Sequence, residues 1–347
     1  MSFEIIKSNI NFDFVGKRKF AYTFSGILIL LSLLSLTLRG PNYGVDFAGG
    51  SIVQVKFSGP VAIDKIREGL RAINIENVSV QSVGDARENE FLLRTDAMET
   101  SADFTSRLNR SLEAATGSPV DIRRLEMVGP QVGSDLKEKA LLAILISLLL
   151  TAIYISGRFE FKWVKSGIVA AVLGGAAYFL YTFNVPMHWI IPLALVVTLV
   201  LFWIFGLKYA LGAIVALIHD VTISAGVLSF FDKEFTITVI AALLTIIGYS
   251  LNDTIIVYDR IRENVKKLPK TYLGVIINRS VNETLSRTIM TQGLTLVMVI
   301  SLYFLGGEII HDFALALLVG FIVGTYSSIY VASPIVLTWE ERSKKKK

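Results

Sequence analysis

The stretch ITVIAALLTIIGYSLNDTIIV, residues 237–257, is an almost unbroken apolar run that contains one charged residue, Asp253. About 20 apolar residues form a helix long enough to span the hydrocarbon core of a bilayer. A charged carboxylate near the centre of such a helix costs roughly 2.5–3.5 kcal/mol on insertion scales, so a chain rarely keeps one for packing alone. The run therefore predicts a transmembrane helix, and it predicts Asp253 as a functional residue that exchanges a proton.

The composition also predicts a membrane protein. Of the 347 residues, 53% are hydrophobic and 18% are charged, which departs strongly from the average soluble domain. The chain contains no cysteine, so disulfide bonds and thiol chemistry are excluded. No GK[ST] sequence follows the glycines of GVDFAGG (44–50), and no hydrolase constellation is present. We therefore predict no nucleotide or other cofactor, no metal and no enzymatic activity.

Eight apolar segments have about the length of a membrane span. They are residues 20–38, 140–156, 166–183, 189–205, 209–230, 235–257, 288–305 and 313–337. The third and fourth segments are weaker candidates, because Gly174-Gly175 interrupts one and Pro186 and Pro192 bracket the start of the other. We predict a helical bundle of six core spans plus this extra pair, which forms either a crossing hairpin or a re-entrant pair.

The polar segment 42–139 is large enough to form a domain of its own. Its pattern predicts a strand, a helix, two strands, a helix and a strand in that order. The six elements are residues 51–57, 61–73, 78–83, 90–95, 101–115 and 120–128. This order is typical of a ferredoxin-like α+β domain. Arginines alternate with acidic residues along it, which indicates a solvated surface and argues against nucleic-acid binding.

The distribution of positive charge predicts the orientation. If the N-terminus is cytoplasmic and the spans alternate, the inside segments hold 20 of the 34 Lys and Arg residues, whereas the short outside loops hold only Lys233. The positive-inside rule favours this arrangement. We expect both termini and the charged segment 258–287 in the cytoplasm, and the 42–139 domain in the periplasm. The first span follows Lys17-Arg18-Lys19 without a cleavage site, so it is expected to be a retained anchor.

One group of polar residues surrounds Asp253. Tyr249 lies one turn before it, and Arg287 and Thr291 lie one turn apart where the next apolar run begins. Asp253 and Arg287 have similar predicted depths on the cytoplasmic side, so the two side chains can meet. Burial favours the neutral carboxyl and a nearby cation favours the ionised one. A helix shift that changes their separation would then switch proton binding, with Thr291 and Tyr249 supporting a chain of water molecules.

A second pair, His219 and Asp220, lies near the middle of the 209–230 segment. For this pair a static hydrogen bond between packed helices is the favoured interpretation. Structural alternatives also exist for the first group, since Asp253 could bond a neighbouring helix and Arg287 could reach the cytoplasmic interface as a topology anchor. The basic C-terminal tail, 338–347, predicts contact with anionic membrane lipid.

Five long motifs occur in order along the chain. They are NYGVDFAGGS (42–51), VGPQVGSDL (128–136), ALGAIVALIHDV (210–221), TIIGYSLNDTIIVYDRIREN (245–264) and LSRTIMTQGLTL (285–296). Together they resemble the SecF family of bacterial protein-export membrane subunits, within the RND superfamily. The resemblance implies a six-span half of a larger assembly, with SecD as partner and the SecYEG translocon as neighbour. It also implies use of the proton motive force to help unfolded preproteins cross the inner membrane.

The resemblance assigns roles to individual residues. Asp253 matches the membrane aspartate linked to proton passage, and Arg287 and Thr291 match the cationic and hydroxyl positions that regulate it. His219 and Asp220 match an HD motif whose role stays open, and both are included among the candidate residues of the proton pathway. The chain departs from the family pattern between RFE (158–160) and its 208–220 segment, where an extra hydrophobic hairpin, 164–207, is expected to lie outside the proton path, against lipid or another subunit.

These observations predict a division of the chain. The expected segments are the N-terminus with the first span (1–41), the outer domain (42–139), the second span (140–163), the hairpin (164–207), the remaining core spans (208–337) and the tail (338–347). The leading hypothesis is a proton-coupled export subunit. A scaffold subunit that conducts no protons is the first alternative, and a small-molecule exporter of the same superfamily is the second.

Overall fold

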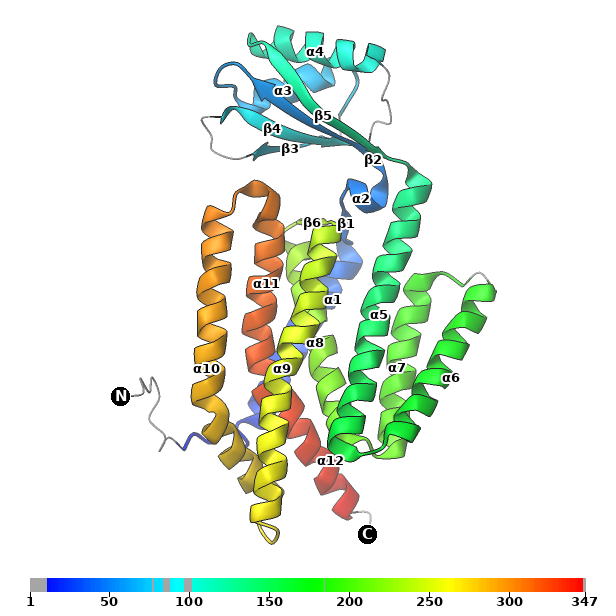
Figure 1. Cartoon of the computed structure of the whole chain (residues 1–347), viewed down its shortest axis with the longest axis vertical. Coiled ribbons are helices and arrows are strands. Elements are labelled where there is room, and N and C mark those ends of the chain that lie inside the picture. Colours follow the sequence, from blue (N-terminus) through cyan, green and yellow to red (C-terminus); the bar gives the residue numbers. More distant parts are fainter. Residues whose placement is uncertain (1–10, 77, 84–87, 97–101, 184, 346–347) are drawn as a thin grey trace.

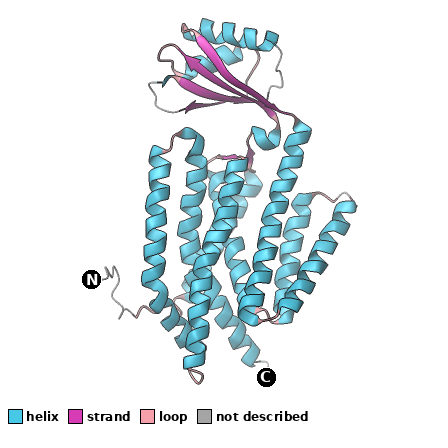
Figure 2. Ribbon diagram, viewed as in Figure 1, coloured by secondary structure: helices cyan, strands magenta, loops and turns pink. Residues whose placement is uncertain are grey.

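Two layers make up the molecule, a bundle of long helices and a small α+β domain stacked on one end of it (Figure 1). The structure is a computed structural model that describes residues 11–76, 78–83, 88–96, 102–183 and 185–345. Figure 2 shows that the strands gather in the small domain and at the junction below it, while the bundle is helical. The bundle helices are α1 (Arg18–Leu38), α5 (Pro130–Glu160), α6 (Trp163–Thr182), α7 (Met187–Phe205), α8 (Lys208–Phe230), α9 (Ile237–Lys267), α10 (Leu273–Leu305), α11 (Glu308–Ser327) and α12 (Ser333–Lys345).

Six helices in the described part of the chain are long and apolar enough to cross a membrane. They are Arg18–Leu38, Pro130–Glu160, Lys208–Phe230, Ile237–Lys267, Leu273–Leu305 and Ile310–Lys344. The predicted class of polytopic helical membrane protein is therefore confirmed. Helices α6 and α7 carry shorter apolar stretches, Trp163–Ala176 and Trp189–Phe205, and they form a hairpin at one side of the bundle (Figure 1).

The last of the six spans, Ile310–Lys344, is a continuous helix that contains a π-helical segment. A π-helical segment, Ser328–Ala332, joins α11 to α12. Pro334 follows this segment and has no N–H to donate to the carbonyl four residues earlier, which accounts for the local change in hydrogen bonding. The hydroxyl of Ser333 donates to the carbonyl of Ser328, the first residue of this segment, at 2.9 Å.

Helix α8 forms the centre of the bundle. In its most apolar window 67% of the residues are buried, against 17% for α1 and for α10. Small residues on α8 allow this close approach of neighbouring backbones. At Gly212 a Cβ atom would lie 2.7 Å from the carbonyl oxygen of Ala332 and 2.4 Å from the hydroxyl of Tyr258. The identity of Gly212 is therefore set by packing.

The outer domain contains a four-stranded sheet in the order β3-β4-β2-β5, and every pairing is antiparallel. Its elements are β2 (Gly50–Phe57), α3 (Ile63–Arg71), β3 (Val78–Val83), β4 (Glu90–Thr95), α4 (Ala102–Thr116) and β5 (Val120–Val128). Alternate residues of β2, including Val53 and Val55, point into a core shared with Leu108 and Leu112 of α4. Helices α3 and α4 cover the sheet face turned away from the bundle (Figure 1).

A compact junction joins the two layers. Gly49 and Gly50 have φ angles of +81° and +130°, which glycine adopts without the strain imposed by a side chain. They lead from the short helix α2 (Val45–Ala48) into β2. Beside them, strand β1 (Asn42–Tyr43) pairs in parallel with β6 (Glu234–Phe235) just before α9. The segment after the first span is thus hydrogen-bonded to the segment that precedes the Asp253 helix.

The two ends of the α6–α7 hairpin lie side by side. The backbone N–H of Tyr209 donates to the Glu160 carboxylate at 2.8 Å, and the ammonium of Lys162 donates to the carbonyl of Gly206 at 3.0 Å. Glu160 thereby caps the N-terminus of α8, where a negative charge is favourable. The α6–α7 hairpin therefore leaves and rejoins the bundle at one point.

Candidate functional site

Asp253 lies at the interface of α9 and α10, and its side chain is buried. Its residue is 1% exposed, and its carboxylate Oδ2 accepts one hydrogen bond, from the side-chain amide of Gln292 at 2.6 Å. Gln292 is 3% exposed. No other hydrogen bond to the carboxylate occurs among the described residues. A buried carboxylate is stabilised by several donors when it is permanently ionised, so Asp253 is an under-bonded acid.

Two further polar atoms on α10 are buried near this interface without a partner among the described residues. They are Oε1 of Gln292 and Oγ1 of Thr288. The two residues are one turn apart and face the same way. Buried polar atoms in native proteins nearly always have a partner, and the exceptions are informative. This part of the α9–α10 interface therefore holds unused hydrogen-bonding capacity next to a buried acid.

Tyr249, Thr291 and Thr295 form a second contact between the same helices. The Tyr249 hydroxyl donates to the carbonyl of Thr291 at 3.3 Å and forms a short hydrogen bond with the Thr295 hydroxyl. The Thr291 hydroxyl bonds within its own helix, to the carbonyl of Arg287 at 3.0 Å. The structure thus brings Tyr249 to the α10 residues that sequence reasoning singled out, while Thr291 itself is exposed.

The direct partner of Asp253 differs from the predicted one. The Arg287 side chain is exposed, and it forms no ion pair with a carboxylate in the described part of the chain, although its charge is near enough to act on Asp253 through space. Arg287 and Gln292 are five residues apart, which places them on different faces of a helix with 3.6 residues per turn. Packing turns the Gln292 face toward α9, so the neutral amide contacts the acid.

His219 and Asp220 belong to a separate network at the centre of the bundle. The Asp220 carboxylate is fully buried and accepts from the Ser250 and Ser327 hydroxyls at 2.6 and 2.7 Å. Its second oxygen lies 2.8 Å from Nδ1 of His219. A carboxylate only accepts, so Nδ1 carries the proton in this pair. Three donors from α8, α9 and α11 therefore satisfy Asp220.

The same network reaches the first span. Nε2 of His219 lies 3.2 Å from the Ser25 hydroxyl, which is 3.1 Å from the hydroxyl of Tyr326. The His219 and Tyr326 rings stack with their centroids 6.1 Å apart. Through these contacts α1 joins α8, α9 and α11. The arrangement is that of an inter-helix clamp.

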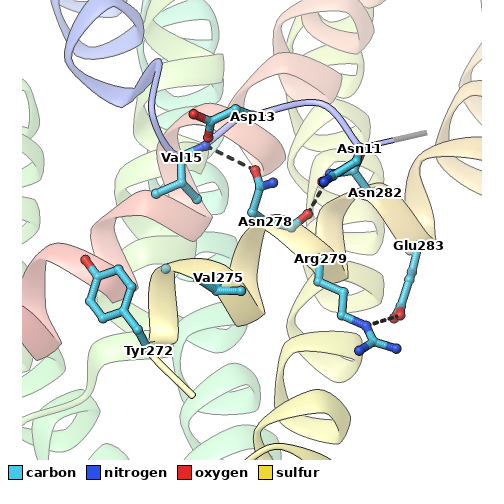
Figure 3. Close-up of a pocket in the computed structure, with 10 residues that line it drawn as sticks. Asn11, Asp13, Val15, Tyr272, Val275, Asn278, Arg279, Asn282 and Glu283 are labelled. Atoms are coloured by element: carbon cyan, nitrogen blue, oxygen red, sulfur yellow. Dashed lines mark hydrogen bonds and ion pairs between the residues drawn. The ribbon is translucent and has the colours of Figure 1, made fainter. Parts of the chain in front are cut away.

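A third polar arrangement lies at the bundle end opposite the outer domain, where the chain before α1 crosses α10 (Figure 3). Asn282 pairs with both backbone groups of Phe12, accepting from its N–H and donating to its carbonyl, each at 2.9 Å. One turn earlier, Asn278 accepts from the N–H of Phe14 at 2.8 Å. An open cleft of about 720 Å³ adjoins these residues. These amides bind backbone groups of Phe12 and Phe14, so the chain before α1 is attached to α10.

The same end also joins the first and last helices. Arg18 of α1 forms an ion pair with Glu341 of α12 at 3.0 Å, and the hydroxyl of Tyr272 donates to the same carboxylate. Hydrogen bonding to this carboxylate raises the pKa of the Tyr272 phenol, because the bond favours the protonated form. The start of α1 and the end of α12 therefore lie at one end of the bundle.

Sequence reasoning missed most of the residues that bond the two acids and His219. Gln292, Ser327 and Ser25 are neutral, so the search for charged groups at membrane depth passed over them, although all three stand in quoted motifs or spans. Ser250 was expected on the Asp253 face of its helix, but its hydroxyl bonds Asp220. A usable signal was present for Gln292, which falls within an apolar run one residue after Thr291. Polar neutral residues that face a bundle interior commonly bond across helices.

The fold and these sites define a polytopic helical membrane protein with two buried acids in its bundle and a small α+β domain at one end. The sequence matches the family model described as protein export membrane protein SecD/SecF, C-terminal, over residues 108–178 and 182–342. It also matches the SecD/SecF GG motif over residues 34–61, which include the two glycines of the junction.

Curated relatives agree with these matches. The chain is 39% identical to the protein translocase subunit SecF of Calditerrivibrio nitroreducens over 336 residues, covering 96% of this chain and 95% of the relative. It is 41% identical to the SecF subunit of Magnetococcus marinus over 339 residues, covering 97% and 94%. The chain belongs to the SecF family of protein translocase subunits.

Solved structures show the same relationship. The crystal structure of SecDF, a translocon-associated membrane protein from Thermus thermophilus, matches with a TM-score of 0.69 and 31% sequence identity. A super-membrane-facing form of SecDF matches with a TM-score of 0.61. Each match covers 97% of this chain and 40% of the SecDF chain, so this chain corresponds to less than half of that protein.

Proposed function

We propose that this chain couples the proton motive force to preprotein movement across the bacterial inner membrane, acting with SecD and the SecYEG translocon. Membership of the SecF family supports a role in protein translocation. The match to 40% of a SecDF chain that is described as translocon-associated supports a larger assembly. We take the coupling ion to be a proton, because the buried group at the site is a carboxyl that accepts a single hydrogen bond.

The observation that carries the proposal is the under-bonded Asp253. The carboxylate is buried at an interface between two spans and accepts one hydrogen bond. An ionisable group inside a membrane bundle is expensive to keep and marks ion pathways and proton relays. Two residues would respond to a change in the charge of Asp253. Arg287 lies on the same helix as Gln292, and its charge acts on Asp253. Tyr249 links α9 to α10.

A physical route leads from this acid to the outer domain. Asp253 lies in α9, and the first residue of that helix, Ile237, donates its backbone N–H to the Asp46 carboxylate at 3.0 Å. Next to it, Arg94 of the outer sheet forms an ion pair with Glu234 of β6 at 2.6 Å, with 14% and 15% of the two side chains exposed. A displacement of α9 on proton binding would therefore be transmitted to the domain above it.

The proposed orientation places this domain in the periplasm and both ends of the chain in the cytoplasm. The charge asymmetry supports it, as does the position of the outer domain at the bundle end away from the start of α1 and the end of α12 (Figure 1). We assign the domain to the ferredoxin-like class. Its element order and its antiparallel sheet order β3-β4-β2-β5 support that assignment.

The available energy is adequate for such a device. A membrane potential of 100 mV supplies about 2.3 kcal/mol for each charge that crosses it. The ion pair between Arg94 and Glu234 is largely shielded from solvent, so it is worth more than the roughly 1 kcal/mol of an exposed pair and is of the same order as this energy. One proton can therefore bias a docked outer domain against an undocked one.

The experiment compares two identical substitutions on one helix. Asp253→Asn should abolish stimulation of preprotein translocation by the proton motive force in inverted membrane vesicles, while the subunit still assembles. Asp259→Asn is the matched control, because Asp259 lies on α9 as an exposed partner of Arg158 and should leave stimulation unchanged. Full stimulation with Asp253→Asn would end the proposal.

The route to the outer domain has its own test. Arg94→Glu should weaken docking and reduce stimulation, and the double variant with Glu234→Arg should restore it, because the swap re-forms the ion pair in the opposite sense. A spin label on an engineered cysteine in β4 reports docking against the natural cysteine-free background. Equal stimulation of translocation in the natural chain, Arg94→Glu and the double variant would exclude this ion pair as the connection between α9 and the outer domain.

A scaffold role is the second candidate, and the α6–α7 hairpin favours it. Its outward side chains are large and apolar, and more than half of the surface of Trp163, Val172 and Trp189 is exposed. Such a face suits lipid or another membrane subunit. Deleting 164–207 should leave the α8 cap intact because Glu160 and Tyr209 already touch. Loss of complex formation on deletion, with full activity of Asp253→Asn, would favour the scaffold.

A further inference from the structure

Gln292 is the residue in direct contact with Asp253. Its amide nitrogen donates to the carboxylate at 2.6 Å, and its amide oxygen is buried without a partner in the described part of the chain. We propose that Gln292 is a positioning residue that bonds Asp253 in both of its charge states, by turning its amide through half a rotation when the acid gains or loses a proton. The inference rests on the proposed role of Asp253 as the proton-binding group.

The chemistry of the two groups makes the amide a suitable partner. An ionised carboxylate can only accept hydrogen bonds, whereas a protonated carboxyl has one O–H to donate. A glutamine amide presents two N–H donors on one side and an acceptor oxygen on the other. Rotation about the terminal bond of its side chain exchanges the two sides with little change in shape. Gln292 can therefore give Asp253 a hydrogen-bond partner in either charge state.

The observed arrangement suits the ionised state, in which both carboxylate oxygens only accept hydrogen bonds. The nitrogen faces the carboxylate, and the oxygen lies unused in the interface. When a proton adds to Oδ2 of Asp253, the new O–H needs an acceptor, and the amide group that faces it is a donor. Turning the amide brings Oε1 to the new O–H, and one hydrogen bond replaces the other. The proton is the only atom gained, and it leaves by the reverse step.

Neighbouring groups do not perform this task. Arg287, on α10, is a cation that can support only the ionised acid, and its side chain is exposed. His219 and Asp220, on α8, are bonded to each other and to serines. Thr288 also faces the interface from α10 with an unpartnered hydroxyl, but no contact joins it to Asp253. Among the described residues, Gln292 alone donates to the Asp253 carboxylate.

Infrared difference spectroscopy of the purified full-length chain in lipid vesicles tests this inference. A protonated carboxyl has a C=O stretching band that moves to higher wavenumber when its hydrogen bond is lost. The Asp253 band is identified by its absence in Asp253→Asn. In Gln292→Met, which keeps the length of the side chain and removes the amide, this band should shift upward. Gln292→Leu is a second apolar variant, so a folding defect in one leaves the test in place.

A substitution at a second glutamine is the control for the infrared spectra. Gln131→Met makes the same chemical change at an exposed residue of α5 and should leave the Asp253 band in place. An unshifted band in Gln292→Met and Gln292→Leu would overturn the inference. So would the absence of any Asp253-dependent carboxyl band across the accessible pH range, because the acid would then not bind a proton.

The infrared spectra test the role of Gln292, and the translocation assay tests the role of Asp253, so either proposal can be wrong while the other stands. If Asp253→Asn supports full stimulation while Gln292→Met shifts the band, the proposed function is wrong and the pairing of the two side chains stands. If Asp253→Asn is inactive and the band does not respond to Gln292→Met, the proton role stands and Gln292 is excluded. A shifted band together with reduced stimulation in Gln292→Met is the result that we expect.

Discussion

Asp220 and Asp253 are both buried carboxylates on adjacent helices, but their surroundings differ. Asp220 accepts from His219, Ser250 and Ser327, which come from three helices. Asp253 accepts from one amide, and unsatisfied atoms of Gln292 and Thr288 lie on the same face of α10. A carboxylate that accepts from several donors holds their helices in a fixed arrangement. A carboxylate with one hydrogen-bond partner can change its charge with little loss of structure.

Ser250 shows how closely the two regions are joined. It lies three residues before Asp253 on α9, yet its hydroxyl donates to Asp220 on α8. Helix α9 therefore has one face attached to the clamp and another facing α10. A change at Asp253 can displace the α10 side while the clamp keeps the α8 side in place. Three stability measurements test this difference between Asp220 and Asp253.

Asp220→Ala should have the largest effect on stability. The substitution leaves His219, Ser250 and Ser327 buried without their shared acceptor, and breaking a buried network of this kind costs about 3–5 kcal/mol. The measurement is the unfolding free energy of the purified protein in detergent, from denaturant titration. Asp259→Ala, at an exposed ion pair on α9, is the control. A loss as small as that of the control would show that the clamp is not structural.

Ser327→Ala should have an intermediate effect. It removes one of three donors to a buried carboxylate, and loss of such a bond costs about 1–3 kcal/mol. The neighbouring Ser328 donates only to a carbonyl of its own helix, so Ser328→Ala serves as the comparison and should be nearly neutral. In the background of Asp220→Ala, the effect of Ser327→Ala should largely disappear, because both side chains belong to one network. Full additivity in the same titration would contradict the network.

Asp253→Asn should have the smallest effect, within about 1 kcal/mol of the natural chain. The asparagine oxygen still accepts from Gln292, and the substitution removes a buried charge that has few partners. The same denaturant titration measures it, beside Asp220→Asn. A destabilisation of Asp253→Asn that equals the one at Asp220 would remove the distinction between the two acids.

Particular residues show how far sequence reasoning reached. The apolar runs predicted the membrane class, the five motifs predicted the family, and Asp253, Asp220 and His219 are buried in the bundle. These inferences needed only local length and residue type. The expected meeting of Asp253 with Arg287 depended instead on how α10 is rotated about its axis. That rotation follows from packing against α9 and α11, which a pattern along one helix does not specify.

The sequence by itself determined that this chain is a membrane protein of the SecF family and that acids occur within its spans, because apolar length and motif identity are local properties. The tertiary structure alone decided which neutral groups surround each acid. Gln292, Ser327 and Ser25 come from helices far from their partners in sequence, and only the packed bundle brings them within hydrogen-bond distance. The number of donors around a buried carboxylate, three for Asp220 and one for Asp253, separates a fixed clamp from a group that can exchange a proton.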